Sequence, residues 1–524
     1  MGTYLNPGNS AFARAVRTRY VDKTGLIGVI NDTIDTALNL TCVSRPRRFG
    51  KSYAAQMLCA YYDRTADSRE LFAPWKISKR ADYETHLNRY NVIYLDMASI
   101  AGVVEDDEIV PFIVRNITME LRAAYPGLRV GETLYATLDS AVECAGSKFI
   151  MVIDEWDVPV REHPASVDAY LNLLRSLFKN SGVTAKLFSA VYMTGILPIK
   201  KLRTQSALSD FREYTMLRPG VFAEYVGFTE AEVRGLCGEY GVDFARMKRW
   251  YDGYELKGVG AVYNPNSVMS AIDSGEFDSY WSRSSAADNL LDFIRWDVDG
   301  LRQAIIALMG GVSLEIDTLG YDNDLSYDTR DAALTMFVHL GYLTYNQEAS
   351  TVRIPNEEIR QEFTRALRRA NNAQTMERVR ESDRLILDTI DGREEAVAEQ
   401  IRRVHEEVSN PLNRNSEASL RSAIQVAYFA YRDYYLKLEE LPTGKGYADI
   451  VYIPKPGKGV PALLVELKWN EDADTAIRQI RQRGYADGVK DFGTELLLVG
   501  ISYDRESKAY TCRIEKWTGP DGGR

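Results

Sequence analysis

Gly50, Lys51 and Ser52 form a Gly-Lys-Ser triplet that stands between an apolar stretch and a helical one. Backbone N–H groups at the start of a helix attract phosphate, and a lysine and a hydroxyl beside them suit a triphosphate with its Mg²⁺ ion. We expect Lys51 to bridge the β- and γ-phosphates and Ser52 to coordinate Mg²⁺. The full phosphate-loop pattern has a glycine where this chain has Arg45, so an ordinary strand-to-helix turn is the alternative interpretation.

An acidic pair follows in the stretch Lys148 to Trp156, which reads KFIMVIDEW. Its apolar residues run into Asp154 and Glu155, as in a buried parallel strand whose carboxyl end lies where open α/β sheets bind ligands. Asp154 is a candidate for the Mg²⁺ shell, and Glu155 is a candidate for polarising the attacking water. A strand that merely ends at a polar loop is the alternative. The order of the two motifs favours a nucleoside triphosphate site.

Thr194 ends another apolar stretch, Lys186 to Thr194, just before Gly195. A polar residue at the end of the strand beside the acidic one can contact the γ-phosphate. Thr194 is therefore a candidate for sensing that phosphate. A threonine that closes a strand before a glycine turn explains the same residues equally well.

A second group of functional residues lies near the C-terminus. Asp449 stands in YADIVYI (Tyr447 to Ile453), while Glu466 and Lys468 stand in ALLVELKW (Ala462 to Trp469). Side chains alternate along a strand, so Glu466 and Lys468 share a face, and a hairpin can bring Asp449 to it. Two carboxylates among apolar strands need a cation, and Mg²⁺ suits a site with few carboxylates and a substrate phosphate. Lys468 would orient water and stabilise charge on a phosphodiester; a surface salt bridge is the alternative.

The segments around these two strands complete the predicted site. Asn415 to Leu438 is predicted as one long helix with Glu417 near its start, and Leu441 to Gly446 is predicted as a turn-rich loop. Thr475 to Tyr485 is predicted as a helix that places Gln479 near the carboxylates.

Apolar strands alternate with helices in the first part of the chain, which predicts an α/β fold with a doubly wound parallel sheet. The pattern then changes to helices with aromatic-rich turns, predicted as a helical lid. A helix followed by two strands between Asp331 and Pro355 resembles a small winged-helix module. We predict four domains: a phosphate-loop ATPase-like domain at 1–225, a helical lid at 226–300, a winged-helix-like region at 301–385, and an α/β nuclease-like domain at 386–524.

The composition limits the classes of partner. The chain has 524 residues, is 45% hydrophobic and carries a net charge of −10, so contacts with nucleic acid must use a local patch. The five cysteines form no CxxC pair, which argues against a zinc site and a disulfide framework. No stretch is apolar enough to span a bilayer. We expect a cytoplasmic protein that does not contact a membrane.

These motifs carry a resemblance to a known family. The chain resembles the bacterial AAA-ATPase-like proteins that end in a PD-(D/E)xK nuclease domain, over nearly its whole length. The segments that carry the resemblance are YVDKTGLI, SRPRRFGKS, VIDEWD, TGILPIK, FTEAEV, RWYDGY, HLGYL, IPNEEI, ELPTGKGYADIVY and LVELKWN. The phosphate loop of that family has the SRPRRFGKS form, so Arg45 at the glycine position is normal there.

The resemblance implies a P-loop NTPase domain, a restriction-endonuclease-like domain and the roles of their residues. We expect the nucleotide to contact the loop and the two strand ends, through Arg47, Arg48, Phe49, Gly50, Lys51, Ser52, Tyr53, Asp154 and Thr194. In the C-terminal domain the resemblance adds Glu417 to Asp449 and Glu466 as a metal ligand. The predicted catalytic residues are Glu155, Asp449, Glu466 and Lys468.

Two functions from different classes are consistent with these residues. The first is an ATPase, with ATP and Mg²⁺ as cofactors, that gates a Mg²⁺-dependent DNA nuclease in defence or in mobile-element biology. A homo-oligomer would allow a neighbouring subunit to supply an arginine finger. The alternative is an NTP-driven switch whose C-terminal domain binds nucleic acid or protein without cutting. The intact Asp449, Glu466 and Lys468 favour the first function, and the net acidity slightly favours the second.

Overall fold

The structure, a computed structural model, divides the chain into two compact units. Unit 1 comprises Met1–Arg283 and Glu315–Ile359, and unit 2 comprises Ser284–Leu314 and Arg360–Arg524. Each unit is therefore assembled from separate stretches of chain, and the finer four-domain division stays a prediction. The structure describes residues 2–517 except 180, 200–207, 209, 282–289, 291–297, 319–328, 370–372, 409–415, 430, 432–433, 444–445, 456–459 and 484–494.

Unit 1 contains the predicted parallel sheet, whose five strands lie in the order β2-β3-β4-β1-β5. Every neighbouring pair is parallel, so the carboxyl ends of the strands share one edge. Strand β4 lies between β1 and β3, which brings Thr194 beside both the phosphate loop and Asp154. The strands are β1 (Leu40–Ser44), β2 (Asn91–Asp96), β3 (Phe149–Asp154), β4 (Phe188–Gly195) and β5 (Arg212–Tyr214).

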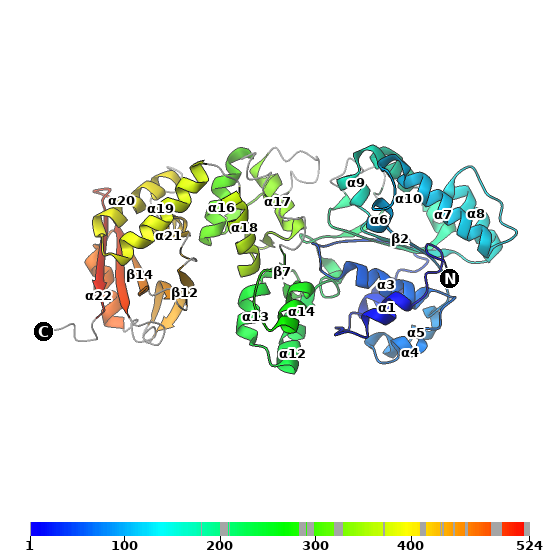
Figure 1. The fold of residues 1–524 in the computed structure, drawn as a ribbon, viewed down its shortest axis with the longest axis horizontal. Helices are drawn as coiled ribbons and strands as arrows, with labels where there is room; N and C mark the ends of the chain where they lie inside the picture. Colours follow the sequence, from blue (N-terminus) through cyan, green and yellow to red (C-terminus); the bar gives the residue numbers. More distant parts are fainter. Residues whose placement is uncertain are drawn as a thin grey trace. The chain divides into compact units, whose positions relative to one another are not determined.

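Helices cover both faces of this sheet, with α3 on one face and α7 and α10 on the other (Figure 1). Helix α7 shows why they pack there: its buried residues Ile109, Ile113, Ile117 and Leu121 recur every four positions and form one apolar stripe. The helices of this region include α1 (Ser10–Ala15), α2 (Gly25–Asn31), α3 (Lys51–Tyr62), α4 (Arg69–Phe72), α5 (Tyr83–His86), α6 (Met97–Ala101), α7 (Ile109–Ala124), α8 (Leu134–Ala145), α9 (Val158–Glu162), α10 (Val167–Phe178) and α11 (Ser181–Leu187).

The remainder of unit 1 is helical with two small sheets. The predicted capping box at Thr229 and Glu232 starts α12, where each residue's backbone N–H donates to the other's side chain. The predicted helix and two-stranded wing are α17 with the antiparallel pair β10 and β11. The elements are β6 (Phe228–Thr229), α12 (Glu230–Tyr240), α13 (Phe244–Tyr251), β7 (Tyr254–Leu256), β8 (Gly260–Tyr263), α14 (Pro265–Ser274), β9 (Leu314–Glu315, shared with unit 2), α17 (Arg330–Leu340), β10 (Thr344–Asn346) and β11 (Thr351–Arg353).

A buried carboxylate fastens residues 315–359 to the rest of unit 1. Glu358 is 1% exposed and accepts hydrogen bonds from the Ser267 hydroxyl at 2.8 Å and from the backbone N–H of Tyr280 and Trp281 at 2.8 and 3.0 Å. The backbone of Gly253 (φ 106°) packs closely against residue Pro355 of this segment, since a Cβ at Gly253 would lie 2.1 Å from the Pro355 carbonyl oxygen. This segment is therefore an integral part of the unit.

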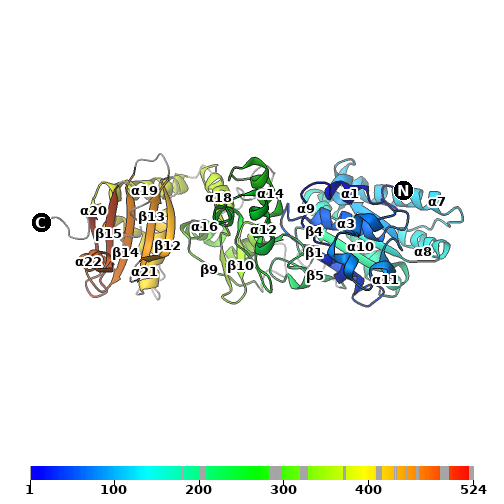
Figure 2. The same cartoon turned by 90° about the horizontal axis from the view of Figure 1, so that it is seen from below.

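Unit 2 is built on a five-stranded mixed sheet in the order β12-β13-β14-β15-β16 (Figure 2). Alternate residues of β14 enter two cores: Leu463 and Val465 pack with α19, α20 and α21, while Leu464 packs with α22 on the opposite face. Among the described residues, no helix is long and apolar enough to cross a bilayer. The elements are α16 (Leu301–Gly310), α18 (Glu357–Arg369, shared with unit 1), α19 (Ala373–Ile390), α20 (Glu394–Val408), α21 (Glu417–Ala427), β12 (Tyr435–Thr443), β13 (Gly446–Pro454), β14 (Ala462–Trp469), α22 (Ala473–Arg483), β15 (Leu496–Tyr503) and β16 (Tyr510–Lys516).

The predicted long helix from 415 to 438 is wrong in its second half, and the predicted loop from 441 to 446 begins too early. Helix α21 ends at Ala427, and β12 extends through Thr443. Tyrosines recur at helical spacing after Ala427. Their rings gather around Tyr452 of β13: Tyr428 stacks on it, and Tyr431 and Tyr435 lie tilted against it, with ring centroids 5.1–6.0 Å from that of Tyr452. This aromatic packing and the β12–β13 ladder override the helical periodicity.

Alanine at Gly253 tests the junction with Pro355. We expect Gly253→Ala to lower the free energy of unfolding by about 2–4 kcal/mol, because the new methyl group meets a fixed backbone carbonyl at positive φ. Gly258→Ala is the matched control: its φ of 91° is similar, but its Cβ would meet open space, so we expect a loss of only about 1 kcal/mol. Urea unfolding of both variants measures the difference, and equal losses would contradict the close contact.

Candidate functional site

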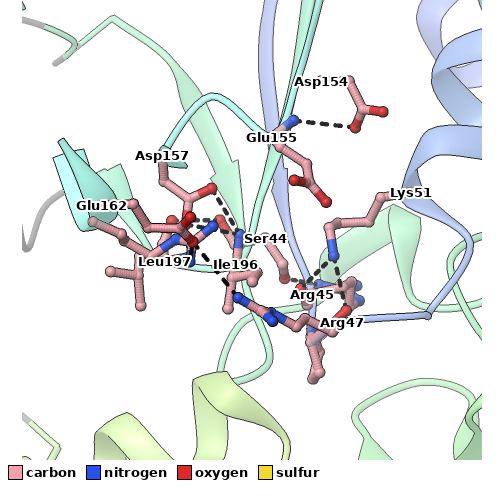
Figure 3. A network of polar contacts seen from close by, with 12 residues as sticks. Ser44, Arg45, Arg47, Lys51, Asp154, Glu155, Asp157, Glu162, Ile196 and Leu197 are labelled. Carbon is pink, nitrogen blue, oxygen red and sulfur yellow. Dashed lines mark hydrogen bonds and ion pairs between the residues drawn. The ribbon is translucent and has the colours of Figure 1, made fainter. Parts of the chain in front are cut away.

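The phosphate loop has the backbone geometry that its glycine predicts. Gly50 caps α3 with a left-handed φ of 91°, and Lys51 follows as the first residue of the helix. Lys51 is 4% exposed, and its ammonium donates to the carbonyl oxygens of Arg45 and Pro46 at 3.0 and 2.8 Å (Figure 3). Burial lowers the pKa of Lys51 to about 8, while the carboxylates of Glu155 and Asp154 oppose the shift. The loop thus positions the buried Lys51 ammonium at the N-terminus of α3.

Arg45 occupies the usual glycine position because its side chain turns beneath the loop. Its guanidinium is fully buried and donates to the carbonyl oxygens of Ser44 and Tyr214 at 2.9 and 3.1 Å. Burial lowers the pKa of Arg45 to about 10, so the side chain stays protonated at neutral pH. Arg45 thereby ties the start of the loop to β5, a role that the triplet pattern did not predict.

Asp154 and Thr194 meet at the ends of β3 and β4. The Thr194 hydroxyl donates to Asp154 Oδ1 at 2.9 Å, and the Glu155 N–H donates to the same oxygen at 3.1 Å. Asp154 is 1% exposed, and burial raises its pKa, while hydrogen bonds from Ser52 and Thr194 oppose that rise. The structure therefore brings together Ser52, Asp154 and Thr194, which were predicted from three separate motifs.

Glu155 adopts a left-handed backbone conformation with φ of 51°, which is unusual for a residue other than glycine. This turn directs its side chain away from Asp154 and toward Lys51 (Figure 3). Burial raises the pKa of Glu155, and the Lys51 charge counteracts this effect. A strained residue with a shifted pKa in a pocket is the pattern of a functional group.

Asp157 is a site residue that the sequence analysis missed. It is fully buried and accepts the backbone N–H groups of Ile196 at 3.2 Å and Leu197 at 3.0 Å, together with Arg161 Nε at 2.8 Å. These bonds join the turn after Glu155 to the turn after Thr194 (Figure 3). The third acid of the VIDEWD segment, four residues before Arg161, was the available signal.

A pocket of about 780 Å³ opens beside the phosphate loop. Of the predicted nucleotide contacts, the pocket is lined by Arg48, Phe49, Gly50, Lys51, Ser52 and Tyr53. The N-terminal segment contributes Tyr20, and the region after β5 contributes Phe228 and Met269. Arg47 instead forms an ion pair with Glu162 at 3.6 Å. The dimensions and the apolar side chains suit a nucleotide base, while the loop suits its phosphates.

The C-terminal residues converge as predicted. The β13–β14 ladder pairs Ile450 with Val465 and ends there, which places Asp449 opposite Glu466 on the neighbouring strand. Asp449 Oδ2 then accepts the Leu467 N–H at 2.9 Å. The Lys468 ammonium donates to Glu466 Oε1 at 3.3 Å. One hairpin therefore brings both carboxylates and the lysine together.

Glu466 is the most perturbed acid of this group. It is 2% exposed, and burial together with the nearby charge of Asp449 raises its pKa to about 7, against the opposing effect of Lys468. Gln479 of α22 donates a short hydrogen bond to Glu466 Oε1, as the predicted helix required. Gly500 lets α22 approach, because a Cβ there would lie 2.4 Å from the Ala473 carbonyl oxygen.

Helix α21 adds Arg421, which the sequence analysis also missed. Arg421 Nη2 pairs with Asp449 Oδ1 at 2.5 Å, so both Asp449 oxygens have protein partners. Glu417 is the exposed first residue of α21, one turn before Arg421 on the same side of the helix. Its predicted role as a metal ligand stays a prediction.

The acidic pair offers a divalent cation one carboxylate oxygen, Oε2 of Glu466. Glu466 Oε2 is buried, and no hydrogen-bond partner for it exists among the described residues. Within the same part of the chain, no three His, Cys, Asp or Glu side chains gather closely enough to hold a metal ion. Asp449 and Glu466 would therefore hold Mg²⁺ with water or substrate phosphate completing its shell, as is usual for this ion.

Comparison with known proteins finds a family match near each end of the chain. Residues 10–203 match the family model of a predicted AAA-ATPase, and residues 416–513 match that of the PD-(D/E)XK nuclease superfamily. An uncharacterized protein from the vnfD 5′ region of Azotobacter chroococcum mcd 1 is 23% identical over 523 residues, with 94% of each chain covered.

Two solved structures show weaker likeness. The Aeropyrum pernix ORC2 protein, in ADPNP and ADP complexes, is 11% identical with a TM-score of 0.28, covering 67% of this chain and 96% of its own. A DNA replication initiation factor is 9% identical with a TM-score of 0.26, covering 79% of this chain and 96% of its own. TM-scores this low carry no functional argument.

The raised pKa of Glu466 predicts pH-dependent stability. Between the usual glutamate pKa of 4.5 and the folded value of about 7, the unfolded chain loses this proton before the folded chain does, so stability falls as pH rises. We expect Glu466→Gln to match the wild type near pH 4.5 and to be more stable by about 2–3 kcal/mol at pH 8. Saturating Mg²⁺ should reduce this advantage, because the cation pairs with the ionised carboxylate of the wild type alone.

Hydrogen exchange of amides in β13 and β14, compared between the two proteins at each pH, measures this difference within the full chain. The comparison at one pH cancels the intrinsic pH dependence of exchange. An advantage of Glu466→Gln that is constant from pH 4.5 to 8 would contradict the raised pKa.

Proposed function

We propose that this chain, an AAA-ATPase-like protein that ends in a PD-(D/E)XK nuclease superfamily domain, hydrolyses ATP and cuts DNA in a Mg²⁺-dependent reaction. ATP turnover in unit 1 would control cutting by unit 2. A nucleotide-controlled DNA nuclease would suit defence against foreign DNA or the movement of a mobile element. The observation that carries the proposal is the pairing of Asp449 with Glu466 beside Lys468, where Glu466 keeps a buried oxygen without a partner among the described residues.

The residues of unit 2 have distinct parts in this chemistry. Asp449 and Glu466 would hold Mg²⁺, which supplies positive charge to polarise the phosphodiester and activate water. Lys468 lies 3.3 Å from Glu466 Oε1, close enough to orient a water molecule at the same site. Its ammonium would also stabilise the negative charge that develops on the phosphate. Gln479 fixes the orientation of the Glu466 carboxylate.

The residues of unit 1 suit phosphoryl transfer to water. Lys51 must exchange the carbonyls of Arg45 and Pro46 for phosphate oxygens, which favours a bound nucleotide because a buried cation then gains an anionic partner. Ser52 and Asp154 would hold the Mg²⁺ of the nucleotide, and Thr194 would contact the γ-phosphate. Glu155 would polarise water, since burial raises its pKa and makes its carboxylate a better base.

A binding-only C-terminal domain is the second candidate function. The Arg421–Asp449 ion pair favours it, since it satisfies one of the two carboxylates without any metal. In that case the chain is a nucleotide-driven switch that binds nucleic acid or protein without cutting. Retention on DNA that is steeply sensitive to salt, without cleavage, would support this function.

Substitutions at Glu155 and Lys51 separate ATP binding from hydrolysis. We expect Glu155→Gln to bind ATP as the wild type does but to hydrolyse it about 100-fold more slowly, because it lacks the base. Lys51→Ala should lose binding itself, because the charge that faces the phosphates is gone. Fluorescent ATP binding and phosphate release measure the two steps.

Glu143→Gln is the control for these two variants, since Glu143 is exposed and pairs with Arg129 on the surface. It should leave both binding and hydrolysis unchanged. Normal ATP affinity in Lys51→Ala would remove the phosphate-loop assignment, and unchanged turnover in Glu155→Gln would remove Glu155 from the reaction.

Lys468→Ala tests the nuclease. We expect the wild type to cut plasmid or single-stranded DNA with Mg²⁺ or Mn²⁺, and Lys468→Ala to cut at least about 100-fold more slowly, because a positioned charge at the phosphate is lost. Lys516→Ala is the matched control, since Lys516 pairs with Glu495 on an exposed part of the same sheet. Assays with and without ATP show whether unit 1 controls the cut. Equal cutting by both variants would contradict the assignment.

A further inference from the structure

The two carboxylates of the C-terminal site are engaged unequally. Asp449 uses Oδ2 for the Leu467 N–H and Oδ1 for Arg421, whereas Glu466 keeps Oε2 without a partner among the described residues. A cation that binds both carboxylates can take Glu466 Oε2 directly. On Asp449 it must share or replace an existing partner. The partner of Oδ1 therefore controls access to the site.

The two partners of Asp449 differ in their freedom to move. The Leu467 N–H belongs to the backbone of β14, which is paired along its length with β15 and cannot leave. Arg421 reaches Asp449 by a long side chain from α21, and that side chain is 31% exposed. The Lys468 side chain has less freedom to move than that of Arg421, since it is only 15% exposed and belongs to strand β14. Arg421 is thus the partner that a cation can displace.

The balance of charge at the site also indicates that a bound cation would displace Arg421. Asp449 and Glu466 carry two negative charges when ionised, and Arg421 and Lys468 carry two positive charges within hydrogen-bond distance of them. This balance is complete without a metal ion. A divalent cation would add two further positive charges, and the guanidinium beside Asp449 would repel it at short range. Binding of the cation and retention of Arg421 therefore compete.

We propose that Arg421 holds the place of the divalent cation at Asp449 and leaves it when the cation binds. This inference rests on the proposed function of the site as a Mg²⁺ centre. The displaced guanidinium remains anchored to α21, one turn from Glu417, at the rim of the site. There it can donate to a phosphodiester oxygen, since arginine forms paired hydrogen bonds with phosphate. Arg421 is thus a residue that couples metal loading to substrate contact.

Mn²⁺ binding to the full chain without nucleotide tests this role directly. Titration calorimetry gives the affinity, and Asp449→Ala identifies which binding belongs to this site. We expect Arg421→Ala to bind Mn²⁺ about tenfold more tightly than the wild type, because a competing positive charge has been removed. Arg421→Met, which keeps an apolar side chain of similar reach, should bind more tightly as well and covers the case in which alanine disturbs folding.

Arg481→Ala is the matched control. Arg481 pairs with Glu515 at 2.8 Å in the same domain, and the two side chains are 28% and 29% exposed, which resembles the Arg421 pair. Its Mn²⁺ affinity should stay within about twofold of the wild type. DNA binding measured with Ca²⁺ should weaken in Arg421→Ala but not in Arg481→Ala, because of these two arginines Arg421 alone lies beside the carboxylates of the site.

The outcomes separate this inference from the proposed function. Weaker or unchanged Mn²⁺ binding in both Arg421 variants, with binding lost in Asp449→Ala, would overturn the inference and make Arg421 a fixed support of Asp449, while the metal site would stand. Unchanged Mn²⁺ binding in Asp449→Ala would overturn the metal site and the inference with it. Tighter binding in the Arg421 variants without cleavage by the wild type would uphold the inference and leave the binding-only function.

Discussion

A charge removed from water must find a partner, and this constraint organises both sites of the protein. In unit 1, Lys51 and Arg45 are buried cations, and each donates to backbone carbonyls that the loop turns toward it. Asp154 is a buried anion that two hydroxyls and a backbone N–H surround. In unit 2, the same requirement pairs Asp449 with Arg421 and Glu466 with Lys468. Lys468 lies on the same strand as Glu466, but Arg421 and Asp449 come from different elements, so the charge of Asp449 is balanced only when α21 packs against the sheet.

Much of the first site could be predicted because local patterns determine it. A glycine before a lysine at the start of a helix commonly adopts a left-handed conformation, as Gly50 does. An apolar run that ends in two acids indicates a strand that is buried on both faces. The order of strands in a parallel sheet then places Thr194 beside Asp154. The C-terminal site followed from side-chain alternation, which places Glu466 and Lys468 on the face that carries α22. These predictions needed periodicity and the usual rules of sheet topology.

Other parts of the sites depend on tertiary contacts that no local pattern encodes. Asp157 and Arg421 act through partners 39 and 28 residues away, and the spacing of an acid or an arginine on a helix does not identify such partners. Tyrosines recur at helical spacing after Ala427, yet the helix ends there and Tyr435 begins a strand, because the rings gather around Tyr452. Aromatic packing against a strand distant in the sequence therefore outweighs the local helical periodicity there.

The division into units has a consequence for how the chain can be dissected. The backbone passes between the units three times, after Arg283, Leu314 and Ile359, and the last passage lies inside the continuous helix α18. Glu358 is fastened within unit 1, whereas Arg360 donates to the Met309 carbonyl within unit 2. A single cut at any of these three positions would therefore divide the residues of at least one unit between the two fragments. Neither half of this protein is a detachable module, and truncation at a sequence boundary removes part of the other half's interior.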